Sequence, residues 1–188
     1  MKRIAAGVLF LLFCLIGIQS KITPKRMRSN VHLTNGSFYP GTDIEIEPGD
    51  LLFTPIGKSE SKYVGHVGIV NGNLKVVHSI PAGLALDEVP AYFQKFRSIT
   101  IFSPVESDVG RNTASFLDAL YGAYPRAAYR VMTPLGFDWH EQYCTKIVWQ
   151  AYYYGSGINL GSYSPHARAI HPELLKDRRF LKIKVKRL

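Results

Sequence analysis

The chain has 188 residues and a net charge of +9, and 46% of its residues are hydrophobic. This length is that of one ordinary globular domain and excludes a string of several domains. The excess of basic residues points to an anionic partner such as a wall polymer, a phospholipid surface or nucleic acid.

The first twenty residues have the pattern of a secretory signal peptide. Lys2 and Arg3 open the chain, and an uncharged apolar run follows over residues 4–18. We expect residues 1–20 to be removed and the protein to be exported to the periplasm or secreted, which argues against nucleic acid as a partner. An uncleaved run would instead tether the protein to the membrane, although it is shorter than the about 20 residues of a typical membrane-spanning helix.

Signal removal would also take away Cys14 and leave Cys144 as the only thiol. A lone cysteine in an oxidising compartment has no partner within the processed chain, so a disulfide there is excluded. Such a cysteine is either a small buried hydrophobe or a reactive group, and its surroundings in the sequence decide between the two.

The part of the chain that follows the signal begins as a polar segment and then forms strands. Residues 21–46 are rich in turn-forming residues, and we expect a flexible lead there. A short buried strand is expected over residues 51–53. The clearest signal is a pair of β-rich runs, residues 66–70 and 74–78, joined by Asn71-Gly72-Asn73. Turn residues of this kind favour a hairpin, so the two runs should pair antiparallel.

The middle of the chain alternates short strands and helices. We expect a strand over residues 83–86, a helix over 89–96 and a strand over 98–102. A longer helix is predicted over 109–121, because apolar residues recur there at three- and four-residue spacing, with Ser107 and Asp108 as its caps. Residues 124–136 contain two prolines and are expected to form a loop.

The last third contains a second convincing helix, over residues 141–154, which Gly155 is expected to end. A short helix over 172–176 and a strand over 180–185 follow. The alternating lysines of that strand serve either ordinary edge protection or contact with an anionic polymer. Residues 47–188 should therefore form one α+β domain, an antiparallel sheet of about five or six strands packed against helices.

Cys144 lies in the first turn of the helix predicted over residues 141–154. The helix dipole and the free amide donors there favour its thiolate, which suits a nucleophile that works with a histidine base. His66 begins one strand of the predicted hairpin and His78 ends the other, so both should lie at the same end of adjacent strands. This pair is the predicted base and the group that orients it. The remaining histidines are His32, His140, His166 and His171.

The run Gly65-His66-Val67-Gly68-Ile69-Val70, with His78 twelve positions after His66, resembles the papain-like cysteine hydrolases of the NlpC superfamily. The cysteine follows the histidines here, as in the circularly permuted branch typified by YaeF and YiiX. That branch has a Gly-Asp-Leu-Leu-Phe-like opening, which is similar to residues 49–53. The resemblance covers roughly residues 47–188 and implies a circularly permuted papain-like fold.

The resemblance also implies a role for each site residue. Cys144 would be the nucleophile, His66 its base, and His78 the group that orients His66. The backbone N–H of Cys144 and the side chain of Tyr124 would stabilise the oxyanion that forms on the substrate.

Two positions depart from the pattern of the relatives. Thr145 replaces a serine, and Lys146 replaces an acidic residue and is expected to affect which substrates fit. A zinc site made from Cys144, His66 and His78 lacks a compact ligand pair, and we expect neither a metal nor another cofactor.

We therefore expect an exported cysteine hydrolase that cleaves amide bonds through an acyl-enzyme, with cell-wall peptides such as those of peptidoglycan as the first substrate class. Anionic envelope polymers or the membrane surface are further expected partners. Two alternatives stay open: a lipid-directed esterase or acyltransferase with the same fold, and a non-catalytic module that binds an envelope polymer.

Overall fold

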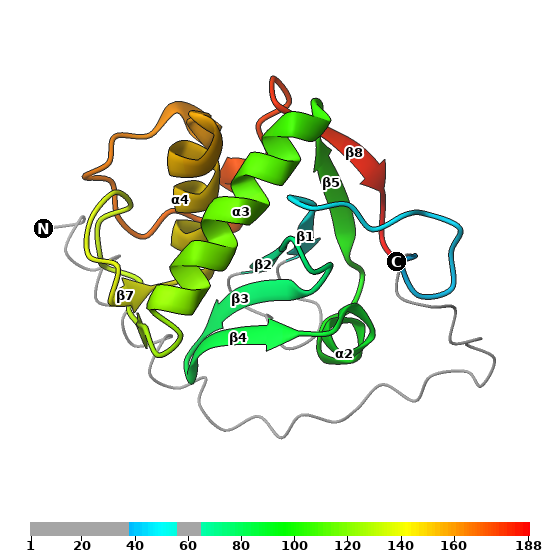
Figure 1. Ribbon diagram of the computed structural model, residues 1–188, viewed down its shortest axis with the longest axis horizontal. Helices are drawn as coiled ribbons and strands as arrows, with labels where there is room; N and C mark the ends of the chain where they lie inside the picture. The colour runs from blue at the N-terminus through cyan, green and yellow to red at the C-terminus, as the bar shows by residue number, and fades with distance from the viewer. Residues whose placement is uncertain (1–37, 56–64) are drawn as a thin grey trace, which may run out of the picture.

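The computed structural model describes residues 38–55 and 65–188, which form an α+β fold (Figure 1). The main sheet is antiparallel, and its strand order is β4-β3-β2-β1-β5-β8. These strands are β1 (Leu51–Thr54), β2 (His66–Val70), β3 (Val76–Ile80), β4 (Gly83–Asp87), β5 (Thr100–Pro104) and β8 (Leu181–Val185). The α+β class and the antiparallel sheet predicted from the sequence are confirmed.

Three α-helices of the described residues pack on this sheet: α2 (Val89–Lys95), α3 (Ser107–Ala123) and α4 (Cys144–Ser156). In Figure 1, α3 and α4 lie side by side, and α4 contacts β2 and β3. Helix α2 packs against residues of the opposite face of the strands. The sheet is therefore covered on both faces, as the apolar runs of its strands require.

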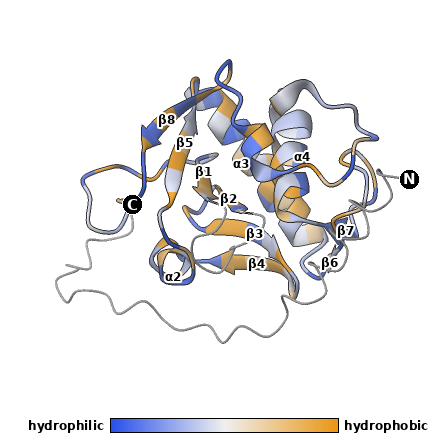
Figure 2. Cartoon of the chain, turned by 180° about the vertical axis from the view of Figure 1, so that it is seen from behind, coloured by the Kyte–Doolittle hydropathy of each residue, from blue (hydrophilic) through white to orange (hydrophobic). Residues whose placement is uncertain are grey.

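Alternate residues of one strand enter two different cores. Leu51 and Phe53 of β1 pack with Trp149 of α4, whereas Leu52 between them packs with Tyr92 of α2. This two-residue alternation is the geometry of a strand with both faces buried. Figure 2 shows the apolar colour gathered on the strands and on the parts of α3 and α4 that meet the sheet.

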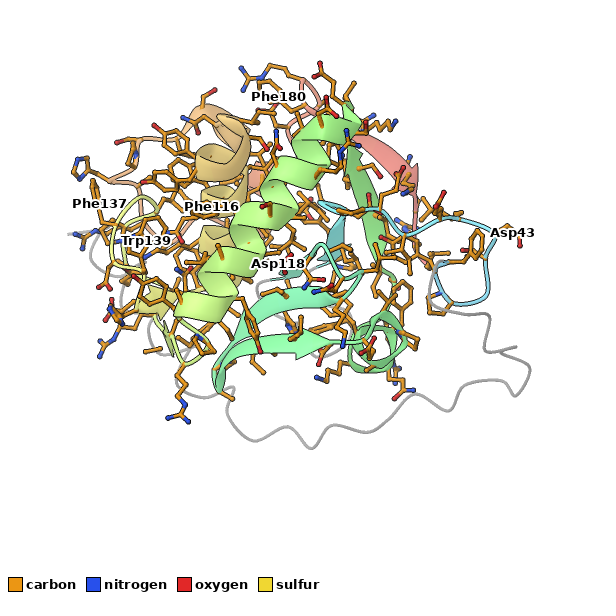
Figure 3. The ribbon with its side chains drawn as sticks, in the orientation of Figure 1. Asp43, Phe116, Asp118, Phe137, Trp139 and Phe180 are labelled. Carbon is orange, nitrogen blue, oxygen red and sulfur yellow. The ribbon has the colours of Figure 1, made fainter. Side chains whose placement is uncertain are left out.

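The predicted hairpin is present as β2 and β3, which pair antiparallel with Val70 opposite Val76. Its turn is attached to α3 by Asp118, which Figure 3 shows on the helix beside the turn. The carboxylate accepts hydrogen bonds from Asn71 Nδ2 at 2.8 Å and from the backbone N–H of Gly72 at 3.0 Å. This attachment fixes the hairpin relative to the two long helices.

The described part of the lead, residues 38–46, is not loosely packed as the composition suggests. Tyr39 and Ile46 are 1% and 4% exposed and belong to the core under α2. The Tyr39 hydroxyl also donates to the buried carboxylate of Asp50 at 2.7 Å. A flexible lead is therefore wrong for these residues, while the predicted signal peptide lies outside the described residues.

Both long helices differ from their predicted bounds at both ends: 107–123 against the predicted 109–121, and 144–156 against the predicted 141–154. Helix α3 has Glu106 as its N-cap, so Ser107 lies inside the first turn. Helix α4 continues past Gly155 and ends at Gly157, whose φ of 69° is the left-handed conformation of a helix C-cap. Gly155 instead allows the two helices to approach closely, because a Cβ there would lie 2.8 Å from the Asn112 carbonyl oxygen of α3.

The predicted loop over residues 124–136 contains a two-residue strand, β6 (Ala128–Tyr129), which pairs in parallel with β7 (Glu141–Gln142). The C-terminal third also contains two 3-10 helices, η3 (Leu160–Ser162) and η4 (Pro172–Leu175). Within residues 38–55 and 65–188, no helix has the length and apolar character that crossing a bilayer requires.

Candidate active site

The structure brings the two predicted histidines together. His66 is the first residue of β2, His78 lies in β3, and Nε2 of His66 is 2.9 Å from Nδ1 of His78. The hairpin register causes this meeting, because Ile69 pairs with Val77 and places the two imidazoles on neighbouring strands. His78 is fully buried, and His66 is 8% exposed.

Two aromatic residues, one in α2 and one at its C-terminal end, enclose the histidine pair. The Phe96 ring, just after the helix, stacks on His66 with centroids 4.6 Å apart, and Tyr92 meets His78 edge-on at 5.1 Å. We missed both residues in the sequence, although Tyr92 and Phe96 are four positions apart and so share one helix face. These rings restrict the rotation of both imidazoles and exclude water from them.

Asp87 is a further member of the site that sequence reasoning missed. Its Oδ2 lies 2.8 Å from Nε2 of His78, and Lys95 Nζ lies 2.7 Å from Oδ1 and 2.8 Å from Oδ2. The predicted strand ended one residue too early. Because Ala85 is the register partner of His78, Asp87 lies two residues further along on the same face.

The electrostatic environment keeps His66 neutral. Burial lowers the pKa of His66 well below its ordinary value, and the neighbouring His78 lowers it further, while Asp87 opposes both effects. Burial disfavours the charged form of Asp87 too, but hydrogen bonds from His78 and Lys95 outweigh it and lower the pKa of that carboxyl. The site therefore combines a neutral imidazole with an ionised carboxylate two hydrogen bonds away.

Cys144 lies in the first turn of α4, as predicted, although the helix begins at Cys144 itself and not at residue 141; its side chain is buried. Hydrogen bonds from the Thr145 hydroxyl and from the backbone N–H groups of Val67, Thr145 and Cys144 favour the thiolate. Burial acts more strongly in the opposite direction and raises the pKa of the thiol above its ordinary value. The expectation that the helix start lowers this pKa is therefore wrong, because burial of the side chain disfavours the charged thiolate more than the donors favour it.

Val67 connects the thiol to the strand that carries His66. The Val67 backbone N–H points to the sulfur, and His66 immediately precedes it in β2. The side-chain hydrogen bond of the sulfur is to Thr145 Oγ1, at 3.8 Å, rather than to an imidazole. The sulfur thus contacts the backbone of the residue after His66, and no hydrogen bond joins it to the His66 imidazole; such bonds often form only when substrate binds.

Two further residues were expected to act at the site: Tyr124 by stabilising the oxyanion, and Lys146 by affecting which substrates fit. The Tyr124 ring packs edge-on against His140 at 4.8 Å. Lys146 is fully buried, and its ammonium donates to Thr133 Oγ1 at 3.0 Å and to the carbonyl oxygens of Phe137 and Asp138. Because its charge is enclosed by the loop before α4, Lys146 has no surface that a substrate could contact, and the expectation that it affects substrate choice is wrong.

A groove of about 640 Å³ is walled by segments that are close to the site residues along the chain, although its lining does not include Cys144, His66, His78 or Asp87. One side is the β3–β4 turn, three residues after His78, and the other is the segment around β6, which pairs with β7 two residues before Cys144. Arg126 and Arg130 line the groove, and Arg130 also pairs with Glu141 at 2.7 Å. The groove is therefore cationic.

The candidate site does not fit a metal ion. Both ring nitrogens of His78 already have hydrogen-bond partners, and one of the two nitrogens of His66 is also used. In residues 38–55 and 65–188, no cluster of three or more His, Cys, Asp or Glu side chains is arranged to hold a metal.

Comparisons with known proteins give the fold but no established activity. No protein-family model matches the chain. An uncharacterised 30.3 kDa protein of Bacillus thuringiensis is 28% identical over 124 residues, covering 60% of this chain and 46% of the relative, so the match spans less than half of that protein. The crystal structure of the metalloprotein yiiX from Escherichia coli O157:H7 is similar with a TM-score of 0.55 and 16% identity. This similarity covers 74% of this chain and 97% of yiiX, so the chain has the fold of yiiX.

Proposed function

We propose that this protein is a thiol-dependent hydrolase that cleaves amide bonds outside the cytoplasm. The observation that carries the proposal is the hydrogen-bonded series of His66, His78 and Asp87 beside a buried thiol at a helix start. A nucleophile, a base and a group that orients the base are the parts that covalent catalysis needs. The fold shared with yiiX is compatible with this assignment and adds no activity of its own.

In the proposed reaction, the sulfur of Cys144 attacks the substrate carbonyl carbon while the thiol proton passes to Nδ1 of His66. The backbone N–H of Cys144, at the start of α4, turns from the sulfur to the oxyanion and stabilises it. When the C–N bond breaks, His66 returns the proton to the leaving amine and an acyl-enzyme remains. Water then attacks the acyl carbon while His66 takes its proton, the C–S bond breaks and releases the carboxylic acid, and His66 returns the proton to the sulfur.

A neutral His66 suits this sequence of steps. Because burial raises the pKa of Cys144 and lowers that of His66, the resting pair is a thiol and an imidazole, not a thiolate and an imidazolium. The proton must therefore move during attack, as it does in general base catalysis.

The groove favours an anionic substrate. Arg126 and Arg130 would attract and orient carboxylate groups of a peptide, and the excess of basic over acidic residues in the chain would strengthen the attraction. Cell-wall peptides have the carboxylates and the amide bonds that this site requires, so we propose them as the substrate class.

A lipid ester is the second candidate. Met132 and Phe137, in the loop before α4, are 58% and 48% exposed, and exposed apolar side chains of this size suit contact with a membrane or with an acyl chain. The same nucleophile and base would cleave an ester.

The test is to incubate the processed protein separately with purified peptidoglycan and with phospholipid vesicles, and to analyse the products together with the intact mass of the protein. We expect new amine and carboxylate ends in the peptides and an acyl adduct on Cys144. The Cys144→Ala variant should lack both. The control variant His166→Gln changes an exposed histidine outside the series of His66, His78 and Asp87, and it should retain both. Products from the vesicles alone would favour the second candidate, and binding without products from either would indicate a non-catalytic module.

A further inference from the structure

We propose that Asp87, held by Lys95, fixes which ring nitrogen of His78 and of His66 carries the proton, and thereby keeps Nδ1 of His66 open to accept the proton of Cys144. This inference rests on the proposed function, because it adds two positioning residues to the same proton path. Neither residue would touch the substrate.

The direction of the hydrogen bonds follows from the chemistry of Asp87. An ionised carboxylate only accepts hydrogen bonds, so the contact of 2.8 Å between Asp87 Oδ2 and His78 Nε2 requires a proton on that nitrogen. While His78 carries one proton, its Nδ1 is a bare acceptor. The contact of 2.9 Å from that Nδ1 to His66 Nε2 then requires a proton on the latter.

The consequence falls on the second nitrogen of His66. A neutral imidazole has one N–H and one bare nitrogen, so a proton on Nε2 leaves Nδ1 with its lone pair. If the series ran in the opposite direction, the proton of His66 would sit on Nδ1, and the imidazole could not act as a base there. The position of one carboxylate thus selects between a competent and an incompetent base.

Lys95 gives Asp87 this fixed role. Its ammonium contacts both carboxylate oxygens, at 2.7 Å and 2.8 Å, so the carboxylate stays ionised and its plane is held toward His78. The side chain of Asp87 is 11% exposed, whereas that of Lys95 is 41% exposed. Lys95 can therefore be replaced with little disturbance of the core.

The decisive variant is Asp87→Asn, which keeps the shape and reverses the hydrogen bond. Lys95 should hold the amide oxygen, so the amide NH₂ would face His78 and donate to its Nε2. The proton of His78 would move to Nδ1 and that of His66 would follow to Nδ1. We expect kcat to fall by about 10²- to 10⁴-fold, the scale of a base held in the wrong protonation form.

A second variant separates this effect from simple damage. In the double variant Asp87→Asn with Lys95→Met, the amide is free to turn its oxygen toward His78, which restores the original direction. We expect it to recover most of the turnover of Lys95→Met alone. A purely structural role of Asp87 predicts the reverse, a double variant less active than either single variant.

The protonation forms themselves can be read from ¹⁵N chemical shifts of the imidazoles in uniformly labelled protein. We expect protonated Nε2 in both histidines of the native chain and protonated Nδ1 in both histidines of Asp87→Asn, with urea unfolding showing that each variant is folded. Unchanged protonation in Asp87→Asn, or protonated Nδ1 of His66 in the native chain, would overturn the proposal. Because this readout needs no substrate, the expected shifts without any hydrolysis would disprove the proposed function while confirming that Asp87 sets the protonation of the two imidazoles.

Discussion

Asp50 and Asp87 each pair with a lysine, but they are surrounded in different ways, and the side chain of Asp87 is 11% exposed. Asp50 is fully buried and is enclosed on all sides by donors. Tyr39, Lys184 and the backbone N–H of Glu47 donate to Oδ2 at 2.7, 3.0 and 3.1 Å, and Ser103 donates to Oδ1 at 2.5 Å. Asp87 instead stands at one end of a line that continues through two histidines.

The two surroundings shift the two carboxyl groups in opposite directions. Burial raises the pKa of Asp50 despite its donors, whereas the bonds from His78 and Lys95 lower the pKa of Asp87 against the effect of burial. The donors to Asp50 come from the segment before β1, from β5 and from β8, so the carboxylate holds these parts of the fold together. The carboxylate of Asp50 with its surrounding donors, here called the closed set, stabilises the fold. The hydrogen-bonded series from Asp87 through His78 to His66, here called the line, ends at Nδ1 of His66, which has no partner among the described hydrogen bonds and can accept a proton.

The largest expected effect is on kcat and follows from replacing His66, the last residue of the line. On any cleaved substrate, His66→Gln should lower kcat by about 10²- to 10⁴-fold, because an amide cannot serve as a base. His78→Gln keeps a hydrogen-bonding group beside His66 and should retain measurable turnover. Steady-state kinetics decide this, with circular dichroism as the check on folding. Equal and complete loss would make His78 a second proton carrier, and full activity of His66→Gln would shift the base to His140, His166 or His171.

The closed set should matter most for stability. Asp50→Ala leaves the mostly buried Lys184 ammonium and the hydroxyls of Tyr39 and Ser103 without their acceptor, and we expect a loss of about 3–5 kcal/mol in the free energy of unfolding. Asp87→Ala should cost about 1–3 kcal/mol, since Lys95 can turn to water. Urea unfolding of both variants measures the difference. A larger loss for Asp87→Ala would mean that the two aspartates are not divided in this way.

The free energy of unfolding should depend on pH in opposite ways through His66 and through Asp50. Because the pKa of His66 is lowered on folding, the unfolded chain binds a proton below about pH 6.5 that the folded chain refuses, and the free energy of unfolding should fall by up to about 1.4 kcal/mol per pH unit. Asp50 has a raised pKa, so its contribution is lost as the pH rises through that value and is regained in acid. Urea midpoints between pH 7.5 and pH 5 should therefore drop in the native chain and drop less in His66→Gln. An identical slope in the two proteins would place the responsible group elsewhere.

The smallest expected effect is on the reactivity of the thiol. Since burial raises the pKa of Cys144, alkylation by iodoacetamide should have its midpoint above the value of about 8.5 of a free cysteine and should be slow at pH 6. Asp50→Ala, measured where it is folded, should leave this midpoint unchanged. A midpoint below pH 7 would show that the helix start and the backbone donors outweigh burial.

The sequence predicts those features that one segment determines by itself. The hairpin, its two histidines and the position of Cys144 at the start of α4 are all local patterns, and the structure confirms them. Asp87 and the ring of Phe96 could not be predicted with equal force, because their roles arise where a strand and a helix meet the hairpin in space. The pKa of Cys144 was wrong for the same reason, since the helix start is visible in the sequence and the depth of burial is not.

The enclosure of Lys146 has a consequence for chemical labelling. Its ammonium is fully buried against three oxygen atoms, and burial lowers its pKa to about 8, so near neutrality it is more easily deprotonated than an ordinary lysine and yet shielded from reagents. An amine-reactive ester should therefore modify the exposed lysines at once and Lys146 only when the loop over residues 133–138 opens. The rate at which the peptide that contains Lys146 gains the mass of the reagent thus measures how often the segment before the proposed nucleophile opens.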